Sequence, residues 1–427
     1  MKYPDILERF VSYVRIDTQS DDASESFPST AKQKDLAAKL KPELEALGLP
    51  DVQVTPWGYV LAAWPTNQPP SSRGGAAPSL RGGAAGKVPT IALIGHLDTS
   101  PDVSGAGVEP RLHKNYGGED LVISAEENIV LKVSENPHLK EQIGKTIITA
   151  SGKTLLGADD KAGIAEIMDA LTFLAEHPEA PRPNIKVVFT PDEETGRGVE
   201  HITAADIGAD YGYTLDGETL GEIEDETFCA DSLEINVSGI NVHPGFAKGK
   251  MVNAVKIAAR IIEKLPKAAL SPETTEKREG YVHPNQVSGN VEAATIKFII
   301  RDFTLKGLKK SEKKIEKLAA RVAAQFPGSK AEVKVSESYR NMKVVLDKHP
   351  DVLAKAEKAV AMAGLTVIRS SIRGGTDGAR LSFMGLPTPN LFTGGHNFHS
   401  KQEWIALEDM KKASEVIVHL MKIWAAE

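Results

Sequence analysis

Cysteine is almost absent from this chain of 427 residues, in which Cys229 is the single thiol. One cysteine excludes an internal disulfide, and it also excludes any thiolate-rich zinc or iron–sulfur site. A metal ion would therefore have to be bound by His, Asp and Glu side chains.

The sequence also lacks a strong excess of one charge and any apolar run long enough to span a membrane. Its 51 Lys and Arg residues oppose 58 Asp and Glu residues, giving a net charge of −7. This mild acidity argues against a dedicated nucleic-acid binder, which needs a basic face. Asp5, Glu8 and Arg9 interrupt the apolar run that a signal peptide would need. We therefore expect a cytoplasmic protein with neither nucleic acid nor membrane as a partner.

The apolar pattern predicts an α/β fold. Short runs typical of buried strands occur at residues 90–95, 185–190 and 211–216. Helical spacing of apolar residues is found at 4–15, 31–48, 160–177, 351–363 and 407–424. For the second of these helices, the hydroxyl of Ser29 or Thr30 is a candidate cap. Alternation of strands and helices predicts a mainly parallel sheet flanked by helices.

A smaller α+β domain interrupts this pattern. Residues 228–341 read as strand, helix, strand, helix, strand, and the strands alternate apolar and polar residues as in an antiparallel sheet. We therefore predict a discontinuous main domain formed by residues 1–227 and 342–427. Within its first part, residues 69–89 are dominated by Gly, Ala, Ser and Pro, which predicts a flexible surface insertion.

Acidic and histidine side chains gather where the predicted strands end. HLDTSPD begins at His96, directly after a buried strand, and residues two apart on a strand face the same side. FTPDEETG places Asp192, Glu193 and Glu194 after another strand, and TLDGE places Asp216 at the end of a third. In open α/β sheets this edge is where ligands bind.

Two further motifs adjoin these strand ends. LLGADDKAGIAEI holds Asp159 and Asp160 at the start of a helix, and NLFTGGHNFHSKQEW holds His396 and His399 after a glycine-rich turn. Each motif alone has an ordinary explanation: a hydrogen-bonded strand-end histidine, a helix cap, or a solvated acidic turn. Residue types also leave open the choices between Asp159 and Asp160, Glu193 and Glu194, and His396 and His399.

Taken together, the motifs supply imidazole and carboxylate donors without sulfur, a set that suits zinc, manganese or cobalt. Two such ions about 3.5 to 4 Å apart would lower the pKa of a shared water from 15.7 toward about 7. A carboxylate that is not a metal ligand would then act as the general base.

These motifs resemble the peptidase T family of tripeptide aminopeptidases, within the di-zinc aminoacylase and carboxypeptidase G superfamily. The similarity extends from DTQS at Asp17 to the last helix, and it includes NVHPGFAKGKMVNA and SIRGGTDGARLSFMGLP. The resemblance implies two zinc ions per subunit, and it makes the inserted domain a lid and dimerisation domain. The insertion at 69–89 departs from the family pattern but touches none of the motifs.

The resemblance also implies a role for each site residue. Asp159 would bridge the two metals. His96 and Asp216 would complete the coordination of one ion, and Glu194 and His399 that of the other. Glu193 would be the general base that takes the proton of the bridging water and passes it to the leaving amine. Asp98 would orient the imidazole of His96.

The smaller domain and the Gly-Gly turn supply candidate substrate contacts. Arg373 precedes Gly374 at a predicted helix start, and the resemblance implies that it binds the peptide carboxylate together with Arg301. His243 would reach across a homodimer to stabilise the oxyanion. The expected function is hydrolysis of the amino-terminal residue from short peptides, chiefly tripeptides. The alternatives are an amidohydrolase that deacylates N-acyl amino acids and a non-catalytic binding protein on the same fold.

Overall fold

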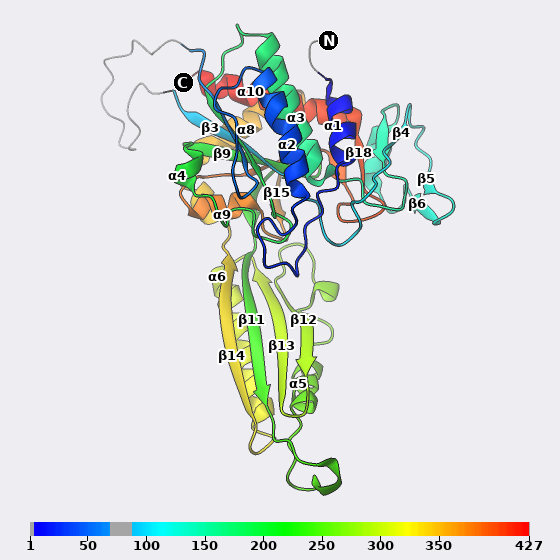
Figure 1. The fold of residues 1–427 in the computed structure, drawn as a ribbon, viewed down its shortest axis with the longest axis vertical. Coiled ribbons are helices and arrows are strands. Elements are labelled where there is room, and N and C mark those ends of the chain that lie inside the picture. Colours follow the sequence, from blue (N-terminus) through cyan, green and yellow to red (C-terminus); the bar gives the residue numbers. More distant parts are fainter. Residues whose placement is uncertain (1–3, 69–87, 427) are drawn as a thin grey trace, which may run out of the picture. The chain divides into compact units, whose positions relative to one another are not determined.

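The computed structural model describes residues 4–68 and 88–426. Most of the predicted insertion, residues 69–87, lies outside the described residues. Contacts divide the chain into two compact units (Figure 1). Unit 1 consists of Met1–Asp225, Val344–Ser370 and Thr376–Glu427, and unit 2 consists of Glu226–Lys343 and Ser371–Gly375.

A sheet of eight strands forms the centre of unit 1. Its strands, in order across the sheet, are β1 (Gln53–Val54), β2 (Val60–Trp64), β8 (Asn184–Thr190), β3 (Thr90–His96), β9 (Tyr211–Gly217), β16 (Asn390–Phe392), β10 (Glu222–Thr227) and β15 (Ile368–Ile372). Strands β8, β3, β9 and β16 are parallel neighbours, whereas β1, β2 and β10 pair antiparallel. The predicted α/β class with a mainly parallel sheet is confirmed.

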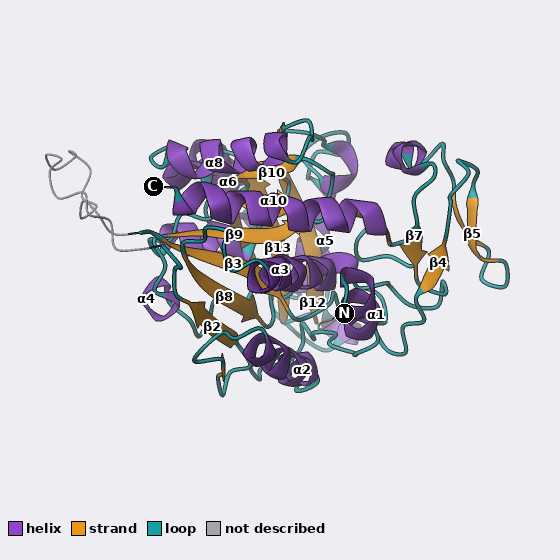
Figure 2. Ribbon diagram, turned by 90° about the horizontal axis from the view of Figure 1, so that it is seen from above, coloured by secondary structure: helices purple, strands orange, loops and turns teal. Residues whose placement is uncertain are grey.

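Helices cover both faces of this sheet. On one face, helices lie side by side in Figure 2: α1 (Ile6–Val14), α3 (Ala158–Glu176), α8 (Pro350–Met362) and α10 (Leu407–Ala425). On the other face, Ile207 of α4 (Ala204–Ile207) and Leu381 of α9 (Asp377–Phe383) join a cluster with Ile94 of β3. Every residue of β3 is buried, as expected for a central strand covered on both sides.

Unit 1 also carries two smaller sheets. One contains β17 (Gly395–His396), β18 (Trp404–Ala406), β7 (Ile147–Thr149) and β4 (Arg111–His113). The other is the hairpin of β5 (Leu121–Ser124) and β6 (Ile129–Leu131). Leu131, Ile147 and Trp404 bring them into one apolar cluster. The 3-10 helix η1 (Pro137–Gln142) packs against this cluster through Leu139.

Unit 2 is an antiparallel sheet with two helices. The strand order is β12 (Tyr281–Gly289), β13 (Ala293–Asp302), β11 (Cys229–Ser238) and β14 (Lys330–Tyr339). The helices α5 (Ala254–Glu263) and α6 (Leu305–Ala323) share one core with β11 and β13, which includes Ile235, Ile257, Phe298 and Ile315. Short helical turns complete the chain: η2 (Pro244–Phe246), η3 (Pro272–Thr274) and α7 (Lys343–Leu346).

The sequence prediction missed β12. Its sequence, YVHPNQVSG, is largely polar and contains Pro284, where the pairing register with β13 shifts. A proline is tolerated at a bulge in an edge strand, and exposed strands lose the alternation on which the prediction relied. The smaller domain therefore has four strands, where three were predicted.

The predicted cap of the second helix is also wrong. Helix α2 spans Gln33–Ala46, and its N-cap residue, Lys32, makes no side-chain capping bond. Thr30 instead donates its hydroxyl hydrogen bond to the Gln19 carbonyl at 2.7 Å, and Ser29 donates to the Asp192 carboxylate. The two hydroxyl groups that the sequence predicted as caps of α2 therefore make tertiary hydrogen bonds instead.

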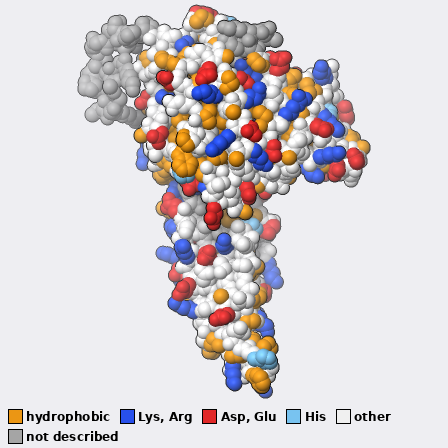
Figure 3. Space-filling model, in the orientation of Figure 1, with side chains coloured by type: hydrophobic (Ala, Val, Ile, Leu, Met, Phe, Trp, Pro, Cys, Tyr) orange, Lys and Arg blue, Asp and Glu red, His pale blue; other side chains and the backbone are white. Residues whose placement is uncertain are grey.

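Acidic and basic side chains are interspersed on the face that Figure 3 shows, and neither sign forms a continuous patch there. Among residues 4–68 and 88–426, no helix has the length and apolar character needed to cross a bilayer.

Candidate metal centre

The candidate site lies in unit 1, where the parallel strands end. His96 is the last residue of β3, Glu193 and Glu194 follow β8, and Asp216 lies near the end of β9. Because parallel neighbours end at the same edge of a sheet, these residues meet although they are far apart in the sequence.

Asp159, in the first turn of α3, lies between two imidazole rings. Its Oδ1 is 2.8 Å from Nε2 of His96, and its Oδ2 is 3.2 Å from Nε2 of His399. One carboxylate therefore presents a separate oxygen to each ring. This arrangement is the one that a carboxylate bridging two cations requires.

Two more carboxylates complete the cluster. Oε2 of Glu194 is 2.9 Å from Nε2 of His399, and Oδ1 of Asp216 is 3.6 Å from Nε2 of His96. Donor atoms of His96, Asp159 and Glu194 lie within 4.8 Å of one another, and so do those of His96, Glu193 and Asp216. Ligands about 2.0–2.1 Å from a tetrahedral zinc ion are ~3.3 Å apart, so these spacings suit a metal.

The crowding of negative charge shifts the pKa values of the cluster. Burial and the neighbouring Asp159 carboxylate raise the pKa of Glu194 to about 8 and that of Asp216 to about 6. Burial lowers the pKa of His399, but its hydrogen bonds to Asp159 and Glu194 outweigh burial and raise it to about 11. Burial and Asp216 raise the pKa of Glu193. The cluster thus favours added positive charge, whether protons or metal cations.

Asp98 holds the turn that carries the two glutamates. Its carboxylate is fully buried and accepts hydrogen bonds from the backbone N–H groups of Glu193 at 3.0 Å and Glu194 at 3.2 Å. Nδ1 of His96 is 3.0 Å from the Asp98 carbonyl oxygen and 3.4 Å from the carboxylate. Asp98 therefore contacts both the His96 imidazole and the backbone of Glu193 and Glu194. The family resemblance implies the first contact, and the second was not predicted.

The structure separates two pairs that the sequence left open. Asp160 turns away from the imidazole rings, and its carboxylate accepts the backbone N–H groups of His96 at 2.9 Å and Gly163 at 3.2 Å. His396 is buried, and its ring stacks with those of His138 and Trp404. Of these pairs, only Asp159 and His399 contact the imidazole and carboxylate groups of the cluster with their side chains.

The remaining predicted residues lie in unit 2. His243 is in an exposed turn, where its Nδ1 accepts the N–H of Gly245 at 3.1 Å. Arg301 donates to the carbonyl of Arg373 at 3.1 Å, and its Nε is buried without a partner. Their substrate roles stay predictions.

The predicted helix start at Arg373 is wrong. Arg373 directly follows β15, and α9 begins only at Asp377, with Thr376 as its cap. The guanidinium group donates to the carbonyl oxygens of Lys277 and Glu279. The glycines after Arg373 therefore belong to a strand-to-helix connection.

Sequence reasoning gave no role to two carboxylates that support the cluster. Oδ2 of Asp102 is 3.3 Å from Nδ1 of His399, on the side of the ring away from Asp159. Glu403 is buried and accepts the backbone N–H groups of Leu156, Gly157 and Asp159 at 2.7, 2.8 and 3.1 Å. Both residues stand inside motifs already noted, but nothing local in the sequence indicates these partners.

Replacing Glu403 with glutamine is expected to destabilise the fold by about 1–3 kcal/mol, because its amide cannot accept all three N–H groups and one is left unpaired. Affinity for a metal ion such as zinc should also fall about 10- to 100-fold, because the first turn of α3, which carries Asp159, loses its support. Urea unfolding and a zinc titration measure the two effects. In the control Glu408→Gln, the amide oxygen can keep the bond from Thr146 N–H, so near-native values are expected. Native behaviour of Glu403→Gln would contradict the assignment.

Comparison with known proteins finds similar chains at the level of sequence and of fold. Residues 155–423 match the sequence model of peptidase family M20/M25/M40. The chain is 45% identical over 421 residues to peptidase T of Clostridium botulinum (strain 657 / Type Ba4), covering 99% of both chains. It is 44% identical over 422 residues to peptidase T of Desulfitobacterium hafniense (strain Y51), covering 99% of this chain and 98% of the relative.

Two solved structures share the fold. The aminopeptidase PepT from Bacillus cereus ATCC 10987 superposes with a TM-score of 0.72 at 23% identity, and a tripeptidase from Staphylococcus aureus with a TM-score of 0.74 at 21% identity. Both comparisons cover 99% of this chain and 98% of the other.

Proposed function

The chain belongs to peptidase family M20/M25/M40, and on this premise we propose that it is a metallopeptidase that releases the amino-terminal residue from short peptides, chiefly tripeptides. The observation that carries this proposal is the Asp159 carboxylate, which offers one oxygen to each of two imidazole rings beside Glu193. The identity to peptidase T over nearly the whole chain supports the same substrate class.

We propose that the cluster binds two zinc ions, with manganese and cobalt fitting the same donors. The donor set contains nitrogen and oxygen but no sulfur. Oε1 of Glu194 is buried without a hydrogen-bond partner, as expected for an atom whose partner is a cation. His96 and Asp216 would hold one ion, Glu194 and His399 the other, and Asp159 both.

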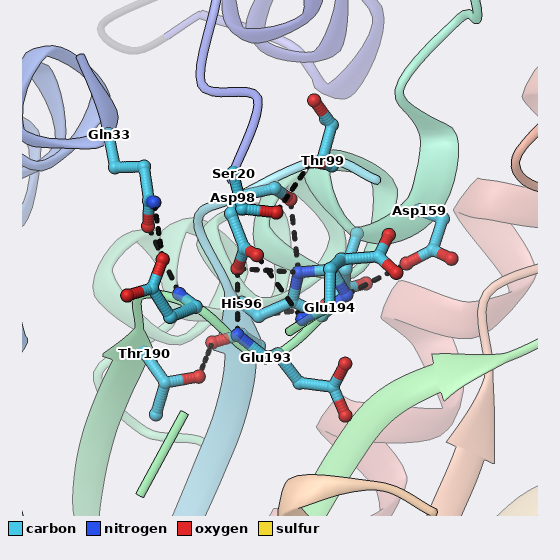
Figure 4. A network of polar contacts seen from close by, with 12 residues as sticks. Ser20, Gln33, His96, Asp98, Thr99, Asp159, Thr190, Glu193 and Glu194 are labelled. Atoms are coloured by element: carbon cyan, nitrogen blue, oxygen red, sulfur yellow. Dashed lines mark hydrogen bonds and ion pairs between the residues drawn. The ribbon is translucent and has the colours of Figure 1, made fainter. Parts of the chain in front are cut away.

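When bound, the cations supply Lewis-acid chemistry, which lowers the pKa of a water molecule and polarises the scissile carbonyl. The protein must still move protons. Glu193 has a carboxylate oxygen within 4.8 Å of donor atoms of His96 and Asp216, but the other five residues can hold both ions without it. Its side chain leaves the turn in a different direction from that of Glu194 (Figure 4). We assign Glu193 as the general base, which accepts a proton from the attacking water and returns it to the leaving amine.

The substrate contacts are proposed from the family resemblance. Arg301 and Arg373 would bind the peptide carboxylate, since a guanidinium group matches a carboxylate with paired donors. His243 would stabilise the oxyanion from the neighbouring subunit of a homodimer. Its exposed position in unit 2 leaves the ring free to contact another molecule. We place the enzyme in the cytoplasm, because its substrates would be small peptides and its thiol content requires no oxidising compartment.

A substrate panel tests this function. We expect zinc-loaded protein to hydrolyse a free-amine tripeptide with a kcat/KM roughly two orders of magnitude above that for the N-acetylated tripeptide or an N-acetyl amino acid. Dipeptides and tetrapeptides should fall between these limits. Preference for the N-acetyl amino acid would instead identify an amidohydrolase, and no turnover of any compound would identify a binding protein.

A further inference from the structure

The turn that presents Glu193 contains a residue in an uncommon backbone conformation. Asp192 has φ of 57° and is fully buried. Residues other than glycine adopt this left-handed region only infrequently, and such a conformation persists when surrounding contacts hold it. Because Asp192 directly precedes Glu193, the contacts that hold it also set where the Glu193 side chain begins.

Those contacts come from the start of helix α2 and the loop before it. Nε2 of Gln33 donates to Oδ1 of Asp192 at 2.6 Å, and Oε1 of Gln33 accepts the Asp192 backbone N–H at 3.0 Å. The backbone N–H of Ser29 donates to Oδ2 at 2.6 Å, and the Ser29 hydroxyl donates to Oδ1. Figure 4 shows the Gln33 side chain reaching down to this turn. We call Ser29, Gln33 and Asp192 the Asp192 network.

The other side of the turn is fixed by Asp98, which accepts the N–H groups of Glu193 and Glu194. Within the turn, the carbonyl of Glu193 accepts the Gly196 N–H at 2.6 Å, and that of Asp192 accepts the Arg197 N–H at 2.9 Å. The amide groups on both sides of the Glu193 Cα atom are therefore held, and only its side-chain torsions remain free.

We propose that Gln33 and Ser29 are positioning residues for Glu193, acting through Asp192 to fix the position of its carboxylate. This inference rests on the proposed role of Glu193 as the general base. Proton transfer requires the base within about 2.6–3.2 Å of its partner, and a displacement of about 1 Å can cost roughly 100-fold in rate. Gln33 is only 1% exposed, and both ends of its amide are used on Asp192.

The test is the substitution Gln33→Met, which keeps the length and apolar stem of the side chain but removes both hydrogen bonds. With zinc-loaded enzyme and a tripeptide, kcat should fall about 10- to 100-fold, while KM changes less than about twofold and zinc content stays native. In the Glu193→Gln background the same substitution should change the residual rate less than about twofold, because the base is already absent.

Two further variants separate positioning from general destabilisation. Leu40→Ala removes a buried apolar side chain from the same helix, so it should lower the melting temperature while leaving kcat native. Ser29→Ala removes one donor but keeps the backbone N–H bond, so its loss of kcat should be smaller than that of Gln33→Met. Ser29→Ala also serves as the test if Gln33→Met fails to fold.

Native kcat in Gln33→Met would overturn the positioning role, and so would a loss that persists undiminished in the Glu193→Gln background. Loss of zinc from Gln33→Met would overturn it as well, since the network would then support Glu194. A wild-type enzyme that fails to hydrolyse the tripeptide, or a fully active Glu193→Gln variant, would overturn the proposed function first. The positioning role is tested with the Gln33 variants, and the proposed function with the wild type and the Glu193→Gln variant. Failure of one can therefore be told from failure of the other.

Discussion

Substituting Glu193 with glutamine is expected to lower kcat for a tripeptide by about 10²- to 10⁴-fold while the protein keeps its full zinc content. Glutamine has the shape of glutamate but cannot accept the proton of the attacking water at neutral pH. The backbone bond from Glu193 N–H to Asp98 does not involve the side chain, so the turn should keep its conformation.

The measurement is steady-state kinetics together with metal analysis of the same preparation. Glu200→Gln is the matched control, because Glu200 follows on the same segment and its side chain pairs with Arg197 outside the cluster. It should have native kcat and zinc content. Retained activity in Glu193→Gln would exclude Glu193 as the base, and a loss of zinc would make it a ligand instead.

Loss of metal binding is the second large effect, and it is expected from substitutions of Asp159 and His399. Asp159→Ala is expected to abolish binding of both ions, because the two oxygens of one carboxylate face both imidazole rings. His399→Phe should lose one ion, since the Glu194 side of the cluster then lacks its nitrogen donor.

Activity should be undetectable in Asp159→Ala. It should also be undetectable in wild-type protein treated with a chelator, and added zinc should restore activity only to the wild type.

His396→Phe provides the contrast. His396 stands three residues before His399, but its ring is buried against His138 and Trp404. A phenylalanine ring can occupy that stack, so this variant should bind both ions. Inductively coupled plasma mass spectrometry gives the zinc content of each variant. Native zinc content in His399→Phe, or loss of zinc only in His396→Phe, would show that the wrong histidine has been assigned.

The sequence predicts for a physical reason that the candidate metal ligands gather at one edge of the sheet. Buried parallel strands leave near-continuous apolar runs, and the polar residues that end them must meet at one sheet edge. His96, the acidic turn with Glu193 and Glu194, and Asp216 were therefore expected together, although more than a hundred residues separate the first from the last. The choice between the two glutamates came from the family resemblance. The structure places all three there.

Other features depend on backbone torsions that local sequence does not encode. Asp159 and Asp160 are adjacent, and neither has helical φ and ψ. The Asp159 carboxylate faces the two imidazole rings, whereas that of Asp160 accepts the backbone N–H of His96 in β3. The family resemblance favours Asp159, but neither propensity nor spacing distinguishes the two residues.

Hydrogen bonds between residues far apart in the sequence, which hold the site residues in place, are harder still to predict. Gln33 and Asp192 are 159 residues apart, and Glu403 and Asp159 are 244 apart. A buried glutamine or glutamate within a polar stretch resembles any solvated residue until the fold brings its partners close. The exposed strand β12 escaped prediction for a related reason, because its polar sequence gives no alternating pattern.

The proposed pair of zinc ions is tested most directly by anomalous X-ray diffraction at the zinc absorption edge from crystals of the zinc-loaded protein. We predict two anomalous peaks about 3.5–4 Å apart, one on each side of the Asp159 carboxylate, with His96 and His399 bound to different ions. A single peak, or two peaks that do not share Asp159, would contradict the proposed metal centre.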